Sequence, residues 1–187
     1  MTATAEVKTN RNWWRIGRLS AAAALLCVPA IAMRFTGEVV WTASDFVVMG
    51  TLLAALLGAY EFLASRAPGT AYRAASVAAT LGLFLLIWMN MAVGVIGTEN
   101  NDANMMFIAV IAIGVGGACL ARFRPAGMKR ALYAAALAQL AVGVIAVAGG
   151  LGTEDPNWPR DVIFLTGFYT GLWAVAGTLF GLSGDRR

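Results

Sequence analysis

The chain contains no histidine. This absence removes the usual axial ligand of haem, the commonest ligand of zinc and copper, and the default general acid or base of enzymes. Only two cysteines are present, Cys27 and Cys119, and both lie inside apolar stretches without CxxC or CxxCH spacing. A disulfide framework, a thioredoxin-like motif and covalent haem attachment are therefore unsupported. We expect no cofactor, no metal site and no enzymatic activity.

Charged residues are also scarce. They make up 13% of the chain, and hydrophobic residues make up 59%, whereas a soluble domain carries about a quarter charged residues. The composition therefore excludes an ordinary soluble domain and indicates that the lipid bilayer is the main partner. A chain of this length can form roughly six spans of about 20 residues with short connections. We expect a single transmembrane domain over residues 1–187 and no extramembrane domain.

The few charges are sorted along the chain. Twelve of the fourteen Lys and Arg residues fall in every second gap between the apolar stretches, and seven of the ten acidic residues fall in the other gaps. Cytoplasmic loops of membrane proteins retain Lys and Arg, so this sorting predicts that both termini are cytoplasmic. The pI near 9.5 then reflects orientation and attraction to anionic lipid, and we expect no binding of nucleic acid.

The gaps divide the chain into six apolar runs, each long enough to cross a bilayer as a helix. A lipid-facing open sheet could not satisfy its backbone hydrogen bonds, so we expect an all-α polytopic bundle. Short acidic outer loops join the runs in pairs, which predicts three helical hairpins. The predicted transmembrane spans are about 16–33, 45–64, 74–96, 105–121, 131–151 and 162–182.

The first run leaves an alternative open. It is short, follows a basic segment and ends in Ala30-Ile31-Ala32, which fits the A-x-A site of signal peptidase. Cleavage there would leave the pattern of three hairpins one helix short, so we favour a retained first helix.

Two segments suggest an internal repeat. Ala-Val-Gly-Val-Ile occurs at residues 92–96 and at 141–145, and a Gly-Thr-Glu tripeptide follows each, at 97–99 and 152–154. The spacing differs between the copies, and membrane helices share Ala, Val and Gly so heavily that chance similarity is common. A true duplication would place a site at the interface of the repeats, as in many transporters.

Three polar residues within the apolar runs are candidates for a substrate or ion path. Glu61 lies near the cytoplasmic end of its span, where a carboxylate can pair with Arg66 or Arg73 at low cost. Asn90 and Gln139 lie deeper, so we expect them to form hydrogen bonds across the bundle, worth about 0.6 to 2 kcal/mol. The alternative is a polar pocket that these amides line together with Thr51, Thr80, Tyr169 and Thr170.

The outer loops gather acidic residues, and oxygen-rich loops can hold a divalent cation. However, Asp45, Asn104 and Asp161 stand just before apolar runs, where short polar side chains cap a helix start. We therefore favour capping and solvation over a cation site. The acidic residues of this outer face are Glu38, Asp45, Glu99, Asp102, Glu154, Asp155 and Asp161.

Small residues mark possible contact faces of helices. The last apolar run carries two GxxxG motifs, Gly167 with Gly171 and Gly177 with Gly181. Such motifs let two helices approach closely, either within one bundle or between subunits. We favour packing within the bundle, and the alternative partners are a second copy of the chain or a larger membrane complex.

Three segments carry a resemblance to known proteins: Trp41-Thr-Ala-Ser-Asp-Phe46, Trp88-Met-Asn-Met-Ala-Val-Gly-Val-Ile-Gly97 and Ala121-Arg-Phe-Arg-Pro125. On these segments the chain resembles a group of small, uncharacterised bacterial multi-pass membrane proteins. The resemblance implies a location in the bacterial inner membrane. It implies no activity, cofactor or site.

These observations favour a non-enzymatic accessory or scaffold component of the membrane. The alternative is a small permease or ion-coupled transporter with a polar path that includes Glu61, Asn90 and Gln139. A membrane enzyme ranks third, because without histidine it would need paired carboxylates facing one cavity. A deep polar cavity between helices would distinguish a transporter from a scaffold.

Overall fold

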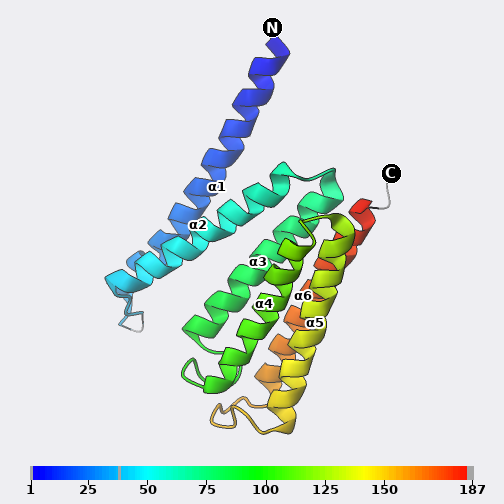
Figure 1. Ribbon diagram of the computed structural model, residues 1–187. Coiled ribbons are helices and arrows are strands. Elements are labelled where there is room, and N and C mark those ends of the chain that lie inside the picture. The colour runs from blue at the N-terminus through cyan, green and yellow to red at the C-terminus, as the bar shows by residue number, and fades with distance from the viewer. Residues whose placement is uncertain (1, 38, 185–187) are drawn as a thin grey trace. The chain divides into compact units, whose positions relative to one another are not determined.

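The structure is a computed structural model that describes residues 2–37 and 39–184. Within these residues the chain is all-helical and contains no strand (Figure 1). The elements are α1 (Thr2–Phe35), α2 (Ala43–Ser65), α3 (Thr70–Ala92), the 3₁₀ helix η1 (Asp102–Met105), α4 (Met106–Leu120), α5 (Pro125–Ala148) and α6 (Arg160–Gly184).

Six segments of the described chain are long and apolar enough to cross a membrane. Each overlaps one of the six predicted spans, so the predicted all-α class and the number of candidate spans are confirmed. The grouping into three hairpins and the cytoplasmic placement of the termini stay predictions.

Several helix ends differ from the predicted ones because glycine and proline act on the backbone. α3 ends at Ala92, before the predicted residue 96, because Gly94 and Gly97 adopt φ values of 80° and 68°, which are unfavourable for other residues. α5 begins at Pro125, before the predicted residue 131. Proline suits the first position of a helix, where the missing N–H has no partner to lose.

The chain divides into two compact units, Met1–Leu57 and Gly58–Arg187, and α2 crosses the boundary between them. Among the described residues of the first unit, the span Ile16–Phe35 of α1 buries no side chain. The first turn of α2 is closed by Asp45, whose carboxylate accepts a hydrogen bond from the Thr42 N–H at 2.7 Å. Asp45 was expected to stand before the helix and cap its free N–H groups. It instead lies in the first turn and reaches back to the residue before the helix, as the third residue of a capping box does.

In the second unit, α4 packs against α5, α5 against α6, and α6 against α3. Glycine allows two of these close contacts. A Cβ on Gly117 of α4 would lie 2.7 Å from the Cβ of Ala131 on α5, and a Cβ on Gly143 of α5 would collide with Thr166 on α6. α3 and α4 approach each other less closely, although they follow one another in the chain.

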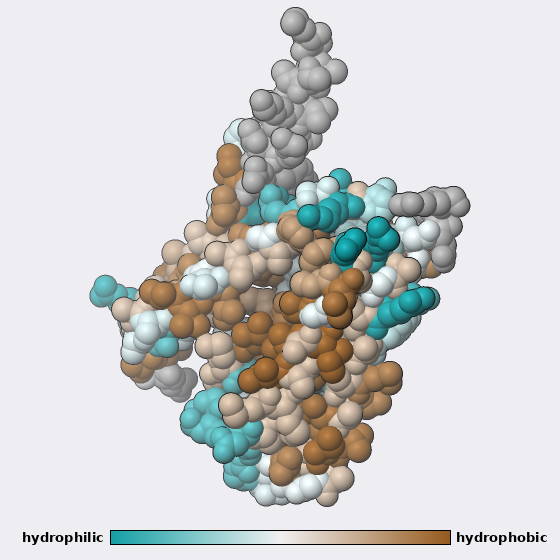
Figure 2. Space-filling view, viewed as in Figure 1, coloured by the Kyte–Doolittle hydropathy of each residue, from teal (hydrophilic) through white to brown (hydrophobic). Residues whose placement is uncertain are grey.

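Most of the outer surface of this unit is apolar, and the charged groups gather at its two ends. Figure 2 shows brown hydrophobic side chains over the middle of the helices and teal hydrophilic groups at both ends. We call one end the basic end: Arg66, Arg73, Arg122, Arg124, Lys129 and Arg130. We call the other the acidic end: Glu99, Asp102, Glu154, Asp155 and Asp161.

Candidate functional site

The candidate path residues lie in different surroundings. Gln139 on α5 is completely buried, and neither atom of its amide group has a hydrogen-bond partner among the described residues. Asn90 on α3 donates from Nδ2 to the Leu86 carbonyl at 2.7 Å, within its own helix. Glu61 is half-buried near the end of α2. The expected hydrogen bonds across the bundle are therefore not formed by the described atoms of Asn90 and Gln139.

Other buried polar groups lie on α6, which packs against α5. Thr166 packs against Gly143, one turn from Gln139 on α5, and Thr170 is one turn from Thr166 on α6. The hydroxyls of both threonines lack a hydrogen-bond partner among the described residues, and so does Nε1 of Trp173. Sequence reasoning named Thr170 but missed Thr166 and Trp173. Their spacing at i, i+4 and i+7 places all three on one face of α6, and this signal could have identified them.

Two other hydroxyls proposed for a polar pocket, those of Thr80 and Thr51, are occupied. Thr80 donates to the Ser76 carbonyl and Thr51 to the Val47 carbonyl, each at 2.8 Å and each within its own helix. Such bonds satisfy a hydroxyl without leaving it free to bind a solute. The buried polar atoms without a partner among the described residues thus lie on Gln139 of α5, on Thr166, Thr170 and Trp173 of α6, and on Asn90 of α3.

The acidic residues do not form a cation site in the part of the chain that the structure describes. No group of three His, Cys, Asp or Glu side chains is close enough there to hold a metal ion. Glu38 lies outside the described residues. Asp161 instead pairs with the neighbouring Arg160 at 3.2 Å on an exposed surface, where such pairs contribute little to stability.

The acidic end is held together by Asn104, which is buried. Its Oδ1 accepts hydrogen bonds from the N–H groups of Val95 and Ile96 at 3.0 and 2.9 Å. Its Nδ2 donates to the carbonyls of Ile96 and Thr98 at 3.2 and 2.8 Å. Asn104 was expected to cap the fourth helix. It instead satisfies the backbone of the loop after α3, because that loop folds back over η1.

A second contact at the acidic end joins two loops. A Cβ on Gly97 would lie 2.9 Å from Cα of Gly152, and a Cβ on Gly152 would lie 2.6 Å from the nitrogen of Gly97. Glu154 accepts a hydrogen bond from the Asn101 side chain, which lowers the pKa of this carboxyl below its ordinary value of 4.5. The loop before α4 is thereby tied to the loop before α6.

The suspected repeat is only partly reflected in the structure. The two Gly-Thr-Glu segments both lie in loops and meet at their glycines. In contrast, Ala-Val-Gly-Val-Ile at 92–96 lies at and beyond the end of α3, whereas the copy at 141–145 lies inside α5. The two pentapeptides are therefore not equivalent in structure, because glycine at 94 adopts a positive φ and its counterpart at 143 stays helical.

One cavity of about 240 Å³ lies among the helices of the second unit. α3 and α4 form its walls, and α5, α6 and the last turns of α2 complete it. The lining is almost entirely apolar. The inner wall consists of buried residues such as Val110 and Leu132, while Val115 and Cys119 at the rim are exposed. This is not the deep polar cavity that a transporter would require.

Aromatic residues line the cavity toward the basic end. The rings of Phe62 and Phe123 meet edge to face, with centroids 4.9 Å apart. The guanidinium of Arg66 lies 3.6 Å from the Phe62 ring centroid and 5.9 Å from that of Phe123. A cation thus sits directly beside the apolar lining.

The turn between α4 and α5 presents Phe123 to the cavity in a strained conformation. Arg122 and Phe123 have φ values of 51° and 59°, a region that costs a residue with a Cβ about 1 to 2 kcal/mol. The hydroxyl of Tyr72, on α3, donates to the Phe123 carbonyl at 2.8 Å. Tyr72 is almost completely buried, so it anchors the strained turn to α3.

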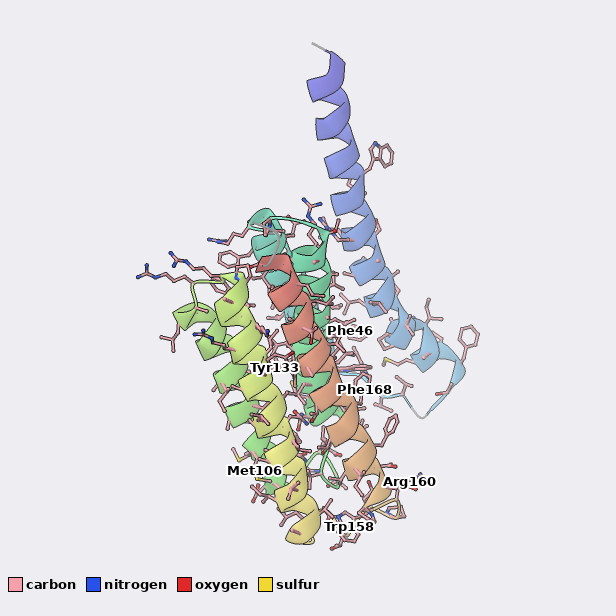
Figure 3. All side chains as sticks on the ribbon, turned by 90° about the vertical axis from the view of Figure 1, so that its right-hand side faces the viewer. Phe46, Met106, Tyr133, Trp158, Arg160 and Phe168 are labelled. Carbon is pink, nitrogen blue, oxygen red and sulfur yellow. The ribbon has the colours of Figure 1, made fainter. Side chains whose placement is uncertain are left out.

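The two GxxxG motifs of α6 serve different purposes. A Cβ on Gly177 would lie 3.3 Å from the Lys129 carbonyl, and one on Gly181 would lie 3.0 Å from the Lys129 side chain, so this pair packs against α5. A Cβ on Gly167 or Gly171 would meet no atom within 4 Å. The labelled Phe168 lies between these two glycines on the outer side of α6 (Figure 3). The Gly167–Gly171 motif is therefore open.

Comparisons with protein-family models, with curated proteins and with solved structures found no match for this chain. The resemblance to small bacterial membrane proteins thus stays a prediction. Two of its three segments have clear structural roles. Residues 88–97 contain the turn that ends α3, and residues 121–125 contain the strained turn that leads into α5.

Proposed function

We propose that this chain is a non-enzymatic component of the bacterial inner membrane that works by associating with other membrane helices. It crosses the bilayer six times as three hairpins and leaves both termini in the cytoplasm. The six apolar helices and the separation of basic from acidic loops support this placement.

The open Gly167–Gly171 face carries the proposal. In lipid, no hydrophobic force drives helices together, and small residues promote association by allowing close backbone contact. Gly177 and Gly181 show this use inside the bundle, where they receive Lys129 of α5. Gly167 and Gly171 offer the same surface with nothing within 4 Å of an added Cβ. A helix of a second copy, or of a larger complex, fits this face.

Energy transfer between donor- and acceptor-labelled copies mixed in liposomes tests the association. We expect transfer with the natural sequence and about tenfold weaker association for Gly171→Leu, because the side chain blocks close approach. Gly116→Leu is the matched control, since a Cβ there also meets nothing within 4 Å but lies on α4. Absence of transfer, or equal loss in both variants, would contradict self-association through this face.

Cysteine labelling tests the orientation. The background is Cys27→Ser, Cys119→Ser, in cells with a permeabilised outer membrane and an intact inner membrane. A membrane-impermeant maleimide added outside these cells should label Asn100→Cys and spare Ser183→Cys. Asn100 lies in the loop after α3 and Ser183 near the end of α6. The reverse pattern would contradict cytoplasmic termini.

A small permease is the second candidate, and one observation favours it. Gln139 on α5 and Thr166, Thr170 and Trp173 on one face of α6 carry buried polar atoms without a partner among the described residues. Buried polar groups in membrane helices mark substrate or ion paths. Proteoliposomes with an internal pH indicator test this idea. A proton flux that Gln139→Leu abolishes would favour the permease, and no flux above that of empty liposomes would count against proton coupling.

A further inference from the structure

The cavity of the second unit combines an apolar interior with cations at one end. Its volume of about 240 Å³ exceeds that of apolar cavities of about 150 Å³ that stay dry and bind benzene. Water finds few partners in such a space, because the lining is almost entirely apolar and its Thr80 hydroxyl is already bonded to the Ser76 carbonyl. Nε1 of Trp173 is the one polar side-chain atom on a described lining residue that lacks a partner. The interior is suited to a hydrocarbon chain.

The rim of the cavity determines how such a chain would enter. Val115 and Cys119 on α4 are exposed and line the cavity, and so does Phe62. All three lie within segments long and apolar enough to cross a membrane. The opening therefore faces sideways between helices rather than toward an aqueous loop, and an acyl chain can enter from the bilayer.

The charge beside the cavity selects the head of the occupant. Arg66 stacks on Phe62, and Arg122 and Arg124 flank Phe123 in the turn before α5; both phenylalanines line the cavity. Guanidinium groups bind phosphate through several parallel hydrogen bonds. The strained turn and the Tyr72 hydrogen bond fix Phe123, and with it the two arginines, at this end.

We propose that this cavity is a specific site for an anionic phospholipid. One acyl chain occupies the space between α3 and α4, and the phosphate lies at the basic end against Arg66 and the arginines of the α4–α5 turn. The inference rests on the proposed membrane location, but it is independent of the association through Gly167 and Gly171.

Native mass spectrometry of the protein released from nanodiscs tests the site with phosphatidylglycerol and phosphatidylcholine as probes. We expect one retained phosphatidylglycerol per chain and at least tenfold weaker retention of phosphatidylcholine. The double variant Arg66→Gln, Arg124→Gln should abolish the preference. Arg160→Gln, a change at the acidic end, is the matched control and should leave it intact. Retention that does not depend on the headgroup would overturn the proposal.

Filling the cavity tests the place of the acyl chain. Gly114→Leu projects a side chain from a lining position whose nearest neighbour, the Cβ of Ala135, would lie 3.6 Å from an added Cβ. This variant should lose the retained lipid, whereas Gly116→Leu, outside the lining, should keep it. Retention by Gly114→Leu would overturn the proposal. A dimer in place of the lipid adduct would identify a second copy as the occupant and would overturn it as well.

A measurement on the protein with Gly114 unchanged makes the test independent of whether Gly114→Leu folds. Trp173 lines the cavity and is only 5% exposed, so lipid outside the bundle cannot reach it closely. Phosphatidylglycerol with brominated acyl chains should quench its fluorescence, and Trp173→Phe should remove that quenched fraction. Equal quenching in both proteins would place the chain elsewhere. Failure of the protein to insert into nanodiscs would contradict the membrane location itself. Loss of energy transfer between donor- and acceptor-labelled copies would contradict only self-association and would leave the lipid site unaffected.

Discussion

The two ends of the second unit are built differently, although both consist of short connections between the same helices. At the acidic end, Asn104 satisfies the backbone of the loop after α3, and the Gly97–Gly152 contact and the Asn101–Glu154 hydrogen bond tie that loop to the loop before α6. At the basic end, exposed arginines surround a strained turn that Tyr72 anchors. The difference indicates that the acidic end contributes stability, whereas the basic end keeps its charged groups available for a ligand.

Removing Asn104 should have the largest effect and is the strongest test of this contrast. Asn104→Ala deletes an amide that makes four hydrogen bonds and leaves buried N–H groups of Val95 and Ile96 unpaired. Each unpaired buried group costs about 1 to 3 kcal/mol, so we expect a loss of roughly 3 to 5 kcal/mol in the free energy of unfolding. Thermal unfolding in nanodiscs measures it.

Asn100→Ala is the matched control, because Asn100 bonds only to the adjacent Glu99 on an exposed surface. Its free energy of unfolding should lie within about 0.5 kcal/mol of that of the natural protein. Equal stability of the two variants would remove the distinction between the ends.

The Gly97–Gly152 contact has the next largest expected effect on stability. Two substitutions there and nearby distinguish the cost of a collision from the cost of a positive φ. Gly97→Ala adds a Cβ that collides with Gly152 and Glu154 at a φ of 68°, and we expect a loss of about 2 to 4 kcal/mol. Gly150→Ala has a similar φ of 63°, but its nearest neighbour would lie 3.8 Å away, so strain alone should cost about 1 kcal/mol. Equal losses in chemical unfolding would show that loop docking contributes nothing.

At the basic end, Tyr72→Phe should have a smaller effect on stability, by about 1 to 2 kcal/mol, because one hydrogen bond to the strained turn is lost. Tyr133→Phe, which loses an exposed bond to Thr178, is the control and should cost less than about 0.5 kcal/mol. The informative readout is lipid retention, which should fall in Tyr72→Phe and persist in Tyr133→Phe. A Tyr72→Phe protein with unchanged retention would show that the turn needs no anchor.

The two ends also differ in how far the sequence predicted them. Six apolar runs and sorted charges were sufficient to predict the helices, because length and hydropathy are local properties. The role of Asn104 depends on a loop that folds back over η1, so its position before an apolar run indicated only a cap. Arg122 and Phe123 adopt positive φ without glycine, which no sequence pattern indicates. The cavity arises from the wider spacing of α3 and α4, a tertiary property.

The smallest expected effect is a loss of local stability at low pH that is confined to the acidic end. The hydrogen bond from Asn101 lowers the pKa of Glu154 in the folded protein below the ordinary 4.5. A depressed carboxyl pKa stabilises the fold above 4.5, and this contribution is lost as the pH falls through the folded value. Hydrogen exchange of residues 94–104 should therefore accelerate below that pH, and Glu154→Gln should remove the acceleration.

The turn at 121–124 provides the internal control in the same experiment. Its charged groups are arginines, which do not titrate in this range, so its exchange should change only with the intrinsic chemical rate of exchange. If acid loosens both ends equally, the loss comes from the bundle as a whole and the Glu154–Asn101 bond is not a separate clamp. If only the loop at 94–104 responds, the two ends open independently, as the different contacts that hold them require.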